Sequence, residues 1–413
     1  MRKPVFAALV SIGLAAAAAG AEAGQLKFIE YSPQRAAVAS APPVPLYTRD
    51  FAQAPPACGT VNPKAKVATI SVGSHTLKVA IDSAKPDAPD PDLVRFDFSG
   101  KGDFRSKPTV PLKTMGTSTS YRRYQIGPAT LRVHRGETTV PVFVAGGYFV
   151  RGTTYRYVYL MLGAAADGSC RFGDKVCGVR VIDGNANLQI NDAVKISLKD
   201  GRVVGARSGR LGSDVVLIDT GGRAFGKSVV ETPYGHRVRL DGKWYQVSIS
   251  DDARISAAEV KVETGKIAIP HDSWSVTLVG TQHMVDLSGA RDPVEVPAGR
   301  YVATSYREYV RTTESSRPAM VAAGRRVLYG AKAAVFDVPA GRTTQLAIGS
   351  PLTASAGVSQ RPGYVDFRAL VMDAGGTEVD YVHGHGGRRP DAPTVTVLNA
   401  KNQRVYQGKM KYG

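Results

Sequence analysis

The sequence is short of long apolar runs, and this limits how the chain can meet a membrane. After residue 23 no segment approaches the ~18 consecutive apolar residues that a membrane-spanning helix needs. Residues 1–23 have a basic start, an apolar stretch of small residues and a small-x-small end at Ala21–Ala23, the pattern of a secretory signal peptide. We therefore expect an exported, soluble protein, periplasmic or extracellular, whose mature chain begins near Gly24.

Short catalytic signatures are also missing. The chain has no G-x-S-x-G nucleophile elbow and no H-E-x-x-H zinc motif, which mark common hydrolases. Its 35 acidic residues would allow a glycosidase with two carboxylates, but that pairing is set in space and leaves no sequence pattern. We identify no catalytic residue and favour an exported, non-catalytic protein of the cell envelope or extracellular space with a binding or structural role. The alternative is an exported hydrolase whose active site is spread over loops.

Acidic residues are outnumbered by basic ones, 35 against 53, which gives a formal net charge of +18. Loss of Arg2, Lys3 and Glu22 with the signal peptide removes two positive charges and one negative charge, leaving +17. A basic exported protein can bind anionic polysaccharide, cell-wall polymer or lipid headgroups, whereas nucleic acid is not expected in this compartment. The basic residues are scattered, with no run longer than a pair, so a generally basic surface is the alternative.

Cysteine is scarce, with three in the whole chain. Cys170 and Cys177 are seven residues apart, and in an exported protein this spacing predicts a disulfide that closes a short hairpin or loop. Such a bridge would stabilise the fold by roughly 2.5 kcal/mol on the chain-entropy model. Cys58 is then a free thiol, or the partner of one of the other two.

The sequence is rich in short runs of Val, Ile, Thr and Tyr that are bounded by Gly, Asp or Asn, and helix signals are nearly absent. One hairpin turn is marked by Asp241-Gly242. We predict an all-β chain of serial β-sandwich-like domains. Residues 24–62 are rich in Pro and Ala and predict a linker or a loosely docked arm, and residues 63–265 form a β-rich region of one or two domains.

Two further modules are indicated by resemblance. Val-Pro-Ala-Gly-Arg occurs at 296–300 and again at 338–342, and VEVPAGRYVATSY resembles the penultimate turn of prealbumin-like or Cna-B-like domains, which implies a β-sandwich module over 266–350. PTVTVLNAKNQRVYQG resembles the closing hairpin of an immunoglobulin-like or fibronectin-like sandwich, which implies such a module over 351–413. The chain as a whole resembles uncharacterised secreted multi-β-domain proteins of environmental bacteria, and this resemblance implies no activity.

The stretch RVIDGNANLQINDAV is similar to a degenerate calcium loop. An EF-hand-type register that starts at the first Asp places oxygens at Asp183, Asn185, Asn187, the carbonyl of Gln189 and Asn191. Leu188 stands where glycine is needed and Val194 where a bidentate acid is needed, so any calcium site is weak. The alternative is a tight turn in which Asn and Asp side chains bond their own backbone. The acidic turns at Asp97 and Asp219 would share an ion only if they met in space. We expect no other cofactor.

Two other motifs resemble functional sites. Residues 221–228, GGRAFGKS, satisfy the phosphate-loop pattern G-x-x-x-x-G-K-[ST], but β-branched residues, Pro233 and Gly235 follow where a helix must begin, so we predict a glycine-rich turn. His383 and His385 have the alternate spacing that would place two imidazoles on one face of a strand, as a metal site requires. No third ligand is identifiable, and exposed loop histidines are the alternative.

Overall fold

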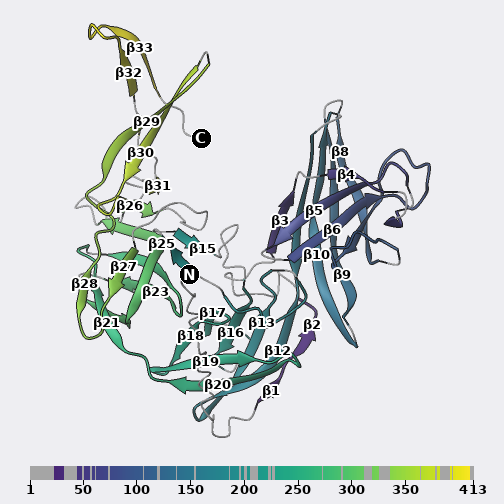
Figure 1. Ribbon diagram of the computed structural model, residues 1–413, viewed down its shortest axis with the longest axis horizontal. Helices are drawn as coiled ribbons and strands as arrows, with labels where there is room; N and C mark the ends of the chain where they lie inside the picture. The colour runs from purple at the N-terminus through teal and green to yellow at the C-terminus, as the bar shows by residue number, and fades with distance from the viewer. Residues whose placement is uncertain are drawn as a thin grey trace, which may run out of the picture.

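The computed structural model confirms the all-β prediction: the elements of the described residues are β-strands (Figure 1). None of the described residues forms a helix that is long and apolar enough to cross a membrane. The description covers residues 23–409 with these gaps: 32–43, 49–50, 56–57, 61, 73–74, 106, 119–120, 136, 153–154, 186, 195–196, 200–201, 205–212, 222–224, 226–227, 272, 290–291, 311–318, 325–334, 363, 377–378, 382–390 and 393. The expected signal peptide therefore lies outside the described residues, except for Ala23.

The first unit is a nine-stranded antiparallel sheet that rolls on itself, here called the rolled sheet. Its strand order is β3-β11-β10-β9-β8-β7-β6-β5-β4. The two edge strands, β3 and β4, follow one another directly in the chain, and β3 also lies against β5, so the two edges of the sheet meet. The bounds are β3 Val44–Thr48, β4 Phe51–Gln53, β5 Lys66–Val72, β6 His75–Asp82, β7 Leu93–Asp97, β8 Thr109–Thr117, β9 Tyr121–Arg135, β10 Thr138–Arg151 and β11 Tyr155–Gly163.

The inside of the rolled sheet is filled by one apolar cluster. Alternate residues of each strand point inward, as the two-residue repeat of a β-strand requires. Val140, Val142 and Val144 on β10 and Val158, Leu160 and Leu162 on β11 are each 1% exposed or less. The same alternation places Phe96 and Ile126 in the cluster. The apolar cluster stops at the end of the roll, and the side chains there separate the core from solvent.

The second unit is a sandwich of two sheets around a second apolar cluster. One sheet has the order β1-β20-β19-β18 and the other β17-β16-β13-β12-β2, and the connection between β13 and β16 carries a separate small hairpin, β14-β15, which contacts β25 (Gly299–Val310). The predicted turn at Asp241-Gly242 joins β18 to β19, and both residues have positive φ, 48° and 83°, as a tight hairpin turn needs. The bounds are β1 Gly24–Gln25, β2 Lys27–Ile29, β12 Ala165–Phe172, β13 Lys175–Ile182, β14 Ser197–Lys199, β15 Arg202–Val204, β16 Val215–Asp219, β17 Val229–Pro233, β18 Arg237–Leu240, β19 Lys243–Ile249 and β20 Arg254–Val260.

The segment 24–62 differs from the predicted linker or loosely docked arm. Its described residues form β1 and β2, which extend the two sheets of the sandwich, and β3 and β4, which complete the rolled sheet. Leu26 and Tyr31 are each 3% exposed. The strands are two to five residues long, too short to leave a periodic pattern, and their stability comes from partners distant in sequence.

The third unit packs the sheet β24-β21-β28 against the larger sheet β23-β22-β25-β26-β31, with β27 also paired to β25. The module predicted over 266–350 lies largely within this unit, which also includes residues 264–265 and 379–381, and its likeness to prealbumin-like or Cna-B-like domains stays a prediction. The two Pro-Ala-Gly turns join β24 to β25 and β27 to β28, and Gly299 of one pairs with Val338 of the other. The bounds are β21 Thr264–Ala268, β22 Trp274–Gly280, β23 Met284–Gly289, β24 Val294–Pro297, β25 Gly299–Val310, β26 Ala319–Gly324, β27 Val335–Val338, β28 Thr343–Gln345 and β31 Val379–Tyr381.

The described part of 351–413 forms two separate hairpins that extend from the third unit (Figure 1). These are β29 Thr353–Arg361 with β30 Tyr364–Met372, and β32 Thr394–Leu398 with β33 Arg404–Lys409. Their large apolar residues are mostly exposed, with Tyr364 at 74% and Val358 at 63%. The described residues here do not form two packed sheets, so the immunoglobulin-like or fibronectin-like module is not observed. Instead β31 joins the sheet of the third unit.

Candidate functional site

The turn that follows β13 carries the predicted calcium ligands. Both carboxylate oxygens of Asp183 accept backbone N–H groups, from Asn185 at 3.1 Å and from Leu188 at 2.7 Å. The side-chain oxygen of Asn185 accepts the N–H of Asn187 at 3.1 Å, and that of Asn187 accepts the N–H of Gln189 at 2.8 Å. The side-chain oxygens at these three predicted ligand positions are therefore already bonded within the turn.

Leu188 adopts the left-handed backbone conformation, with φ 67°, that the loop of an EF-hand reserves for glycine. Its side chain is 4% exposed and packs into the cluster of the rolled sheet. That burial offsets the steric cost of the left-handed conformation, about 1–2 kcal/mol. Leu188 thus adopts the conformation that this position of a calcium loop requires, although the sequence has no glycine there.

Asp214, just before β16, supports the same turn and was not predicted from the sequence. Its carboxylate is fully buried and accepts the N–H groups of Gly184 at 3.1 Å and Asp192 at 2.7 Å. Burial raises the pKa of this carboxyl well above its usual range, and the nearby charge of Asp183 raises it further. Asp214 lies about thirty residues from the turn in sequence, so no local spacing signals the contact.

Two side-chain NH2 groups of the turn donate hydrogen bonds to carboxylates. Asn187 Nδ2 donates to Asp192 at 2.7 Å, and Asn191 Nδ2 donates to Asp251 at 2.7 Å. Within the described part of the chain no three His, Cys, Asp or Glu side chains gather in a group that could hold a metal ion. These contacts favour the self-bonded turn, and calcium at this turn stays a prediction.

The turns at Asp97 and Asp219 use the same device in different units. Asp97, at the end of β7, accepts the N–H groups of Ser99 at 3.0 Å and Gly102 at 2.6 Å. Asp219, at the end of β16, accepts those of Gly221 and Phe225, both at 2.9 Å. A buried Asp that ends a strand and caps the next turn therefore recurs, and it explains the acidic turns without a shared ion.

The phosphate-loop pattern lies in the connection between β16 and β17. β17 starts at Val229, directly after Ser228, so a strand stands where phosphate binding would require the start of a helix. This agrees with the predicted glycine-rich turn, although residues 222–224 and 226–227 lie outside the description. His383 and His385 also lie outside the described residues.

Cys170 and Cys177 lie directly opposite one another on β12 and β13, and both side chains point into the cluster of the sandwich. They are free thiols in the structure, as is the buried Cys58. Burial raises the pKa of Cys170 to about 12 and also raises that of Cys177. The predicted pairing therefore has the right neighbours, and the bond itself is not formed in this structure.

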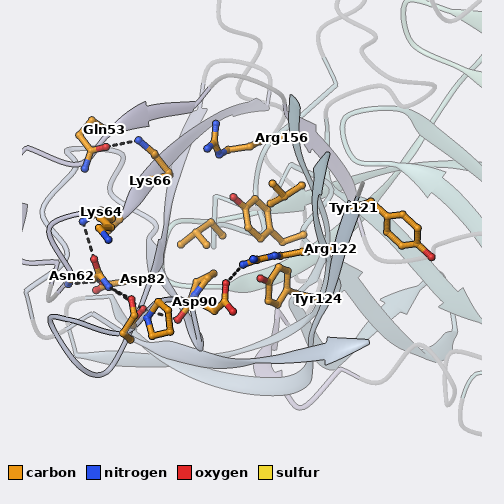
Figure 2. A pocket seen from close by; sticks show the side chains of 18 of the residues that line it. Gln53, Asn62, Lys64, Lys66, Asp82, Asp90, Tyr121, Arg122, Tyr124 and Arg156 are labelled. Atoms are coloured by element: carbon orange, nitrogen blue, oxygen red, sulfur yellow. Dashed lines mark hydrogen bonds and ion pairs between the residues drawn. The ribbon is translucent and has the colours of Figure 1, made fainter. Parts of the chain in front are cut away.

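A pocket of about 740 Å³ lies at one end of the rolled sheet (Figure 2). Three inward-facing positions on adjacent strands form one row: Arg122 on β9 pairs with Val150 on β10, which pairs with Arg156 on β11. The next row inward contains Tyr124 on β9 and Tyr148 on β10. The pocket is thus where the inner face of the rolled sheet changes from apolar core to basic side chains.

The two tyrosines form the inner wall of the pocket. Tyr124 and Tyr148 are 4% and 3% exposed, and their rings stack with centroids 5.7 Å apart. Burial raises the pKa of both phenols, and a hydrogen bond with a guanidinium opposes this, from Arg122 for Tyr124 and from Arg156 for Tyr148. The phenols are therefore neutral near pH 7, and each lies next to one of the two arginines.

Basic residues outnumber acidic ones in the lining. Lys64 and Lys66 approach from the start of β5, opposite the two arginines, and Lys66 bonds Gln53 of β4 (Figure 2). The acids that line the pocket are Asp82 and Asp90. Asp82 is 1% exposed and accepts Arg95 Nε at 2.7 Å and the N–H of Asn62 at 2.9 Å, so its charge is already compensated.

A second polar cluster lies in the third unit and bears on the hydrolase alternative. His271 Nδ1 lies 3.3 Å from the buried Glu308, and Glu308 accepts the N–H of Ser350 at 2.9 Å and its hydroxyl at 3.0 Å. The second ring nitrogen of His271 contacts the carbonyl of Ile348 at 3.0 Å. A serine triad needs the imidazole between the serine and the acid, whereas here the acid lies between them, so the cluster anchors the chain near residue 350.

The comparisons with known proteins identify no relatives. No known protein family and no curated protein matches the sequence. Among solved structures, a leucine-rich repeat protein from Bacteroides thetaiotaomicron matches with a TM-score of 0.16 and 10% identity, over 57% of this chain and 24% of that protein. This chain therefore spans about a quarter of the length of that protein, and at this TM-score the likeness carries no argument about fold or function.

Proposed function

We propose that the chain is an exported, non-catalytic binding protein of the cell envelope or extracellular space, and that its pocket in the rolled sheet binds an acidic polysaccharide. The observation that carries this proposal is the row of Arg122 and Arg156 above the Tyr124–Tyr148 pair. Guanidinium groups bind carboxylates through two parallel hydrogen bonds. The two tyrosines beneath them are buried and support the arginines from the side of the core.

The charge of the lining supports an anionic ligand. Four lining residues are basic, Lys64, Lys66, Arg122 and Arg156, against Asp82 and Asp90. Arg95 compensates Asp82 from outside the lining, which leaves a clear excess of positive charge. The net charge of the whole chain, +18, adds long-range attraction for a polyanion. A volume of about 740 Å³ falls within the 300–1,000 Å³ of ordinary ligand sites.

The engagement of the lining carboxylates supports binding rather than hydrolysis. A glycosidase needs two carboxyl groups that flank the bond to be cut, one of them as an acid. Asp82 is held by Arg95 and by the backbone of Asn62, and Asp90 is paired with Arg122. Both carboxylates of the lining are thus engaged by arginines of the protein, and the proposal assigns the pocket no catalytic step.

The same proposal includes oxidation of the Cys170–Cys177 pair after export. Residues directly opposite in an antiparallel pair have Cα atoms about 4.5–5.5 Å apart, which falls within the range for a disulfide. An exported protein meets an oxidising compartment. The bond would fasten the β12–β13 hairpin at the centre of the sandwich.

Titration calorimetry with polygalacturonate and with a neutral galactan of matched length tests the binding proposal. We expect binding of the acidic polymer that weakens with salt and little binding of the neutral one. Arg122→Gln and Arg156→Gln should each lower the affinity about tenfold, as loss of a charge-assisted hydrogen bond does. Arg132→Gln removes an exposed charge on β9 outside the pocket and should change the affinity by less than about twofold. If Arg132→Gln and Arg156→Gln lowered the affinity equally, the binding would be due to general surface charge and the pocket proposal would be wrong.

A further inference from the structure

Asp90 lies in a loop whose backbone is held by hydrogen bonds from buried side chains. The loop connects β6 to β7, and its backbone is bonded by two buried side chains. Ser83 Oγ donates to the carbonyl of Asp90 at 3.1 Å, and Asn62 Nδ2 donates to the carbonyl of Ala88 at 3.0 Å. The backbone of Asp90 is therefore held in place while its side chain remains half exposed.

That side chain forms an ion pair with Arg122 inside the pocket (Figure 2). Tyr124 lies next to Arg122 in the lining (Figure 2) and contributes to raising the pKa of its guanidinium. A carboxylate of the protein thus already occupies the guanidinium that the proposed function assigns to the ligand.

We propose that Asp90 stands in for a carboxylate of the ligand, and that the pocket selects sugars bearing a carboxylate because only these replace Asp90 on Arg122. This inference rests on the proposed function. Arg122 and Asp90 are each 50% exposed, and exposed ion pairs are weak, so the exchange costs little. A uronic acid restores the contact that Asp90 gives up, whereas a neutral sugar offers no charge to Arg122 and leaves Asp90 in place.

In this exchange Asp90 lowers the affinity for every ligand, and it also makes the pocket prefer acidic sugars over neutral ones. Every ligand must compete with a carboxylate fixed close to Arg122, and a free carboxylate on a flexible chain does so only when other contacts hold it in the pocket. Arg156 and Lys66, on the facing strands, are placed to supply those contacts. Removing the negative charge at Asp90 should therefore strengthen binding of acidic sugars instead of abolishing it.

The test compares wild type, Asp90→Asn and Asp87→Asn by calorimetry with a galacturonic acid trisaccharide and with the neutral galactose trisaccharide. Asp87 is an exposed acid of the same loop that does not line the pocket, so its variant controls for net charge. We expect Asp90→Asn to raise the affinity for the acidic trisaccharide about two- to fivefold, the range of an exposed ion pair, and Asp87→Asn to leave it nearly unchanged. The neutral trisaccharide should show no such gain.

The possible results separate the inference from the proposed function. If wild type binds the acidic trisaccharide and Asp90→Asn binds it equally or more weakly, the binding function stands and the role of Asp90 is wrong. If both variants gain equally, the effect is one of net charge and the role of Asp90 is again wrong. If neither wild type nor Asp90→Asn binds, both proposals fail. If Asp90→Asn binds the acidic trisaccharide and wild type does not, the exchange is supported. Asp90 would then compete for Arg122 more strongly than its exposure indicates.

Discussion

His283 packs edge-on against Trp244, with the ring centroids 5.2 Å apart. The contact joins the second unit, which contains Trp244 on β19, to the third, where His283 precedes β23. His236 is buried at the same junction, and the N–H of Arg237 donates to the carbonyl of Gln282 across it at 2.9 Å. Among the described atoms, neither ring nitrogen of His236 nor Nε2 of His283 has a well-formed hydrogen bond. The junction is therefore adapted to neutral imidazoles.

This arrangement predicts loss of stability in mild acid. Burial lowers the pKa of His236 and of His283 to about 4 from an ordinary value of 6.5, and the charge of Arg237 contributes for His283. Between these pH values the unfolded chain binds protons that the folded chain does not, so the free energy of unfolding falls as the pH drops from about 6.5 to 4. Each histidine contributes up to about 3 kcal/mol to this fall.

Thermal unfolding at pH 7 and at pH 4.5 measures the effect. His236→Phe should reduce the difference between the two unfolding temperatures, whereas His134→Phe, at an exposed site on β9, should not. An equal pH dependence in wild type and in both variants would contradict the prediction.

The hydrogen bonds in the turn at Asp183 predict that the free energy of unfolding depends on this carboxylate more than on calcium. Asp183→Ala leaves the buried N–H groups of Asn185 and Leu188 without their acceptor, at about 1–3 kcal/mol each. We expect a marked drop in unfolding temperature for this variant and the same unfolding temperature for wild type in millimolar calcium and in chelator. A rise of several degrees with calcium that is absent in Asp183→Ala would instead establish the calcium loop.

The cysteines predict a defined mass for the exported protein. Intact mass without reductant should be 2 Da lower than with reductant, the two hydrogens lost when Cys170 and Cys177 form their bond. Alkylation after unfolding should then label Cys58 alone, and Cys58 should react slowly in the folded protein because it is 7% exposed. Three labelled cysteines in unreduced material would disprove the bridge.

Much of the strand content could be predicted because it is written in local patterns. Alternation of Val, Ile and Tyr, the Asp241-Gly242 turn and the two Pro-Ala-Gly turns each lie within a few residues of what they determine. The rejection of the phosphate-loop pattern at residues 221–228 depended on local chemistry too, because Pro233 and Gly235 would fall inside the helix that must follow Lys227, and the paired valines favour a strand.

The pocket could not be predicted, for a physical reason. Lys66, Arg122 and Arg156 are ordinary basic residues on strands that are dozens of positions apart, and only the closure of the rolled sheet brings them together. The role of Asp214 could not be predicted for the same reason, because Asp214 is about thirty residues in sequence from the turn that it contacts. Edge strands as short as β1 and β2 carry too little sequence to reveal their partners.

The pairing of Gly24 with Ile255 and of Ala165 with Ile29 sets an order of assembly for a chain that emerges from its N-terminal end. The rolled sheet has all its strands once Gly163 has emerged, whereas the sandwich must wait for β20, some ninety residues later. Until then β1 lacks its strand partner, whereas β2 can pair as soon as β12 has emerged. Contacts of such long sequence separation form slowly, so the sandwich should be the later of the two units to fold.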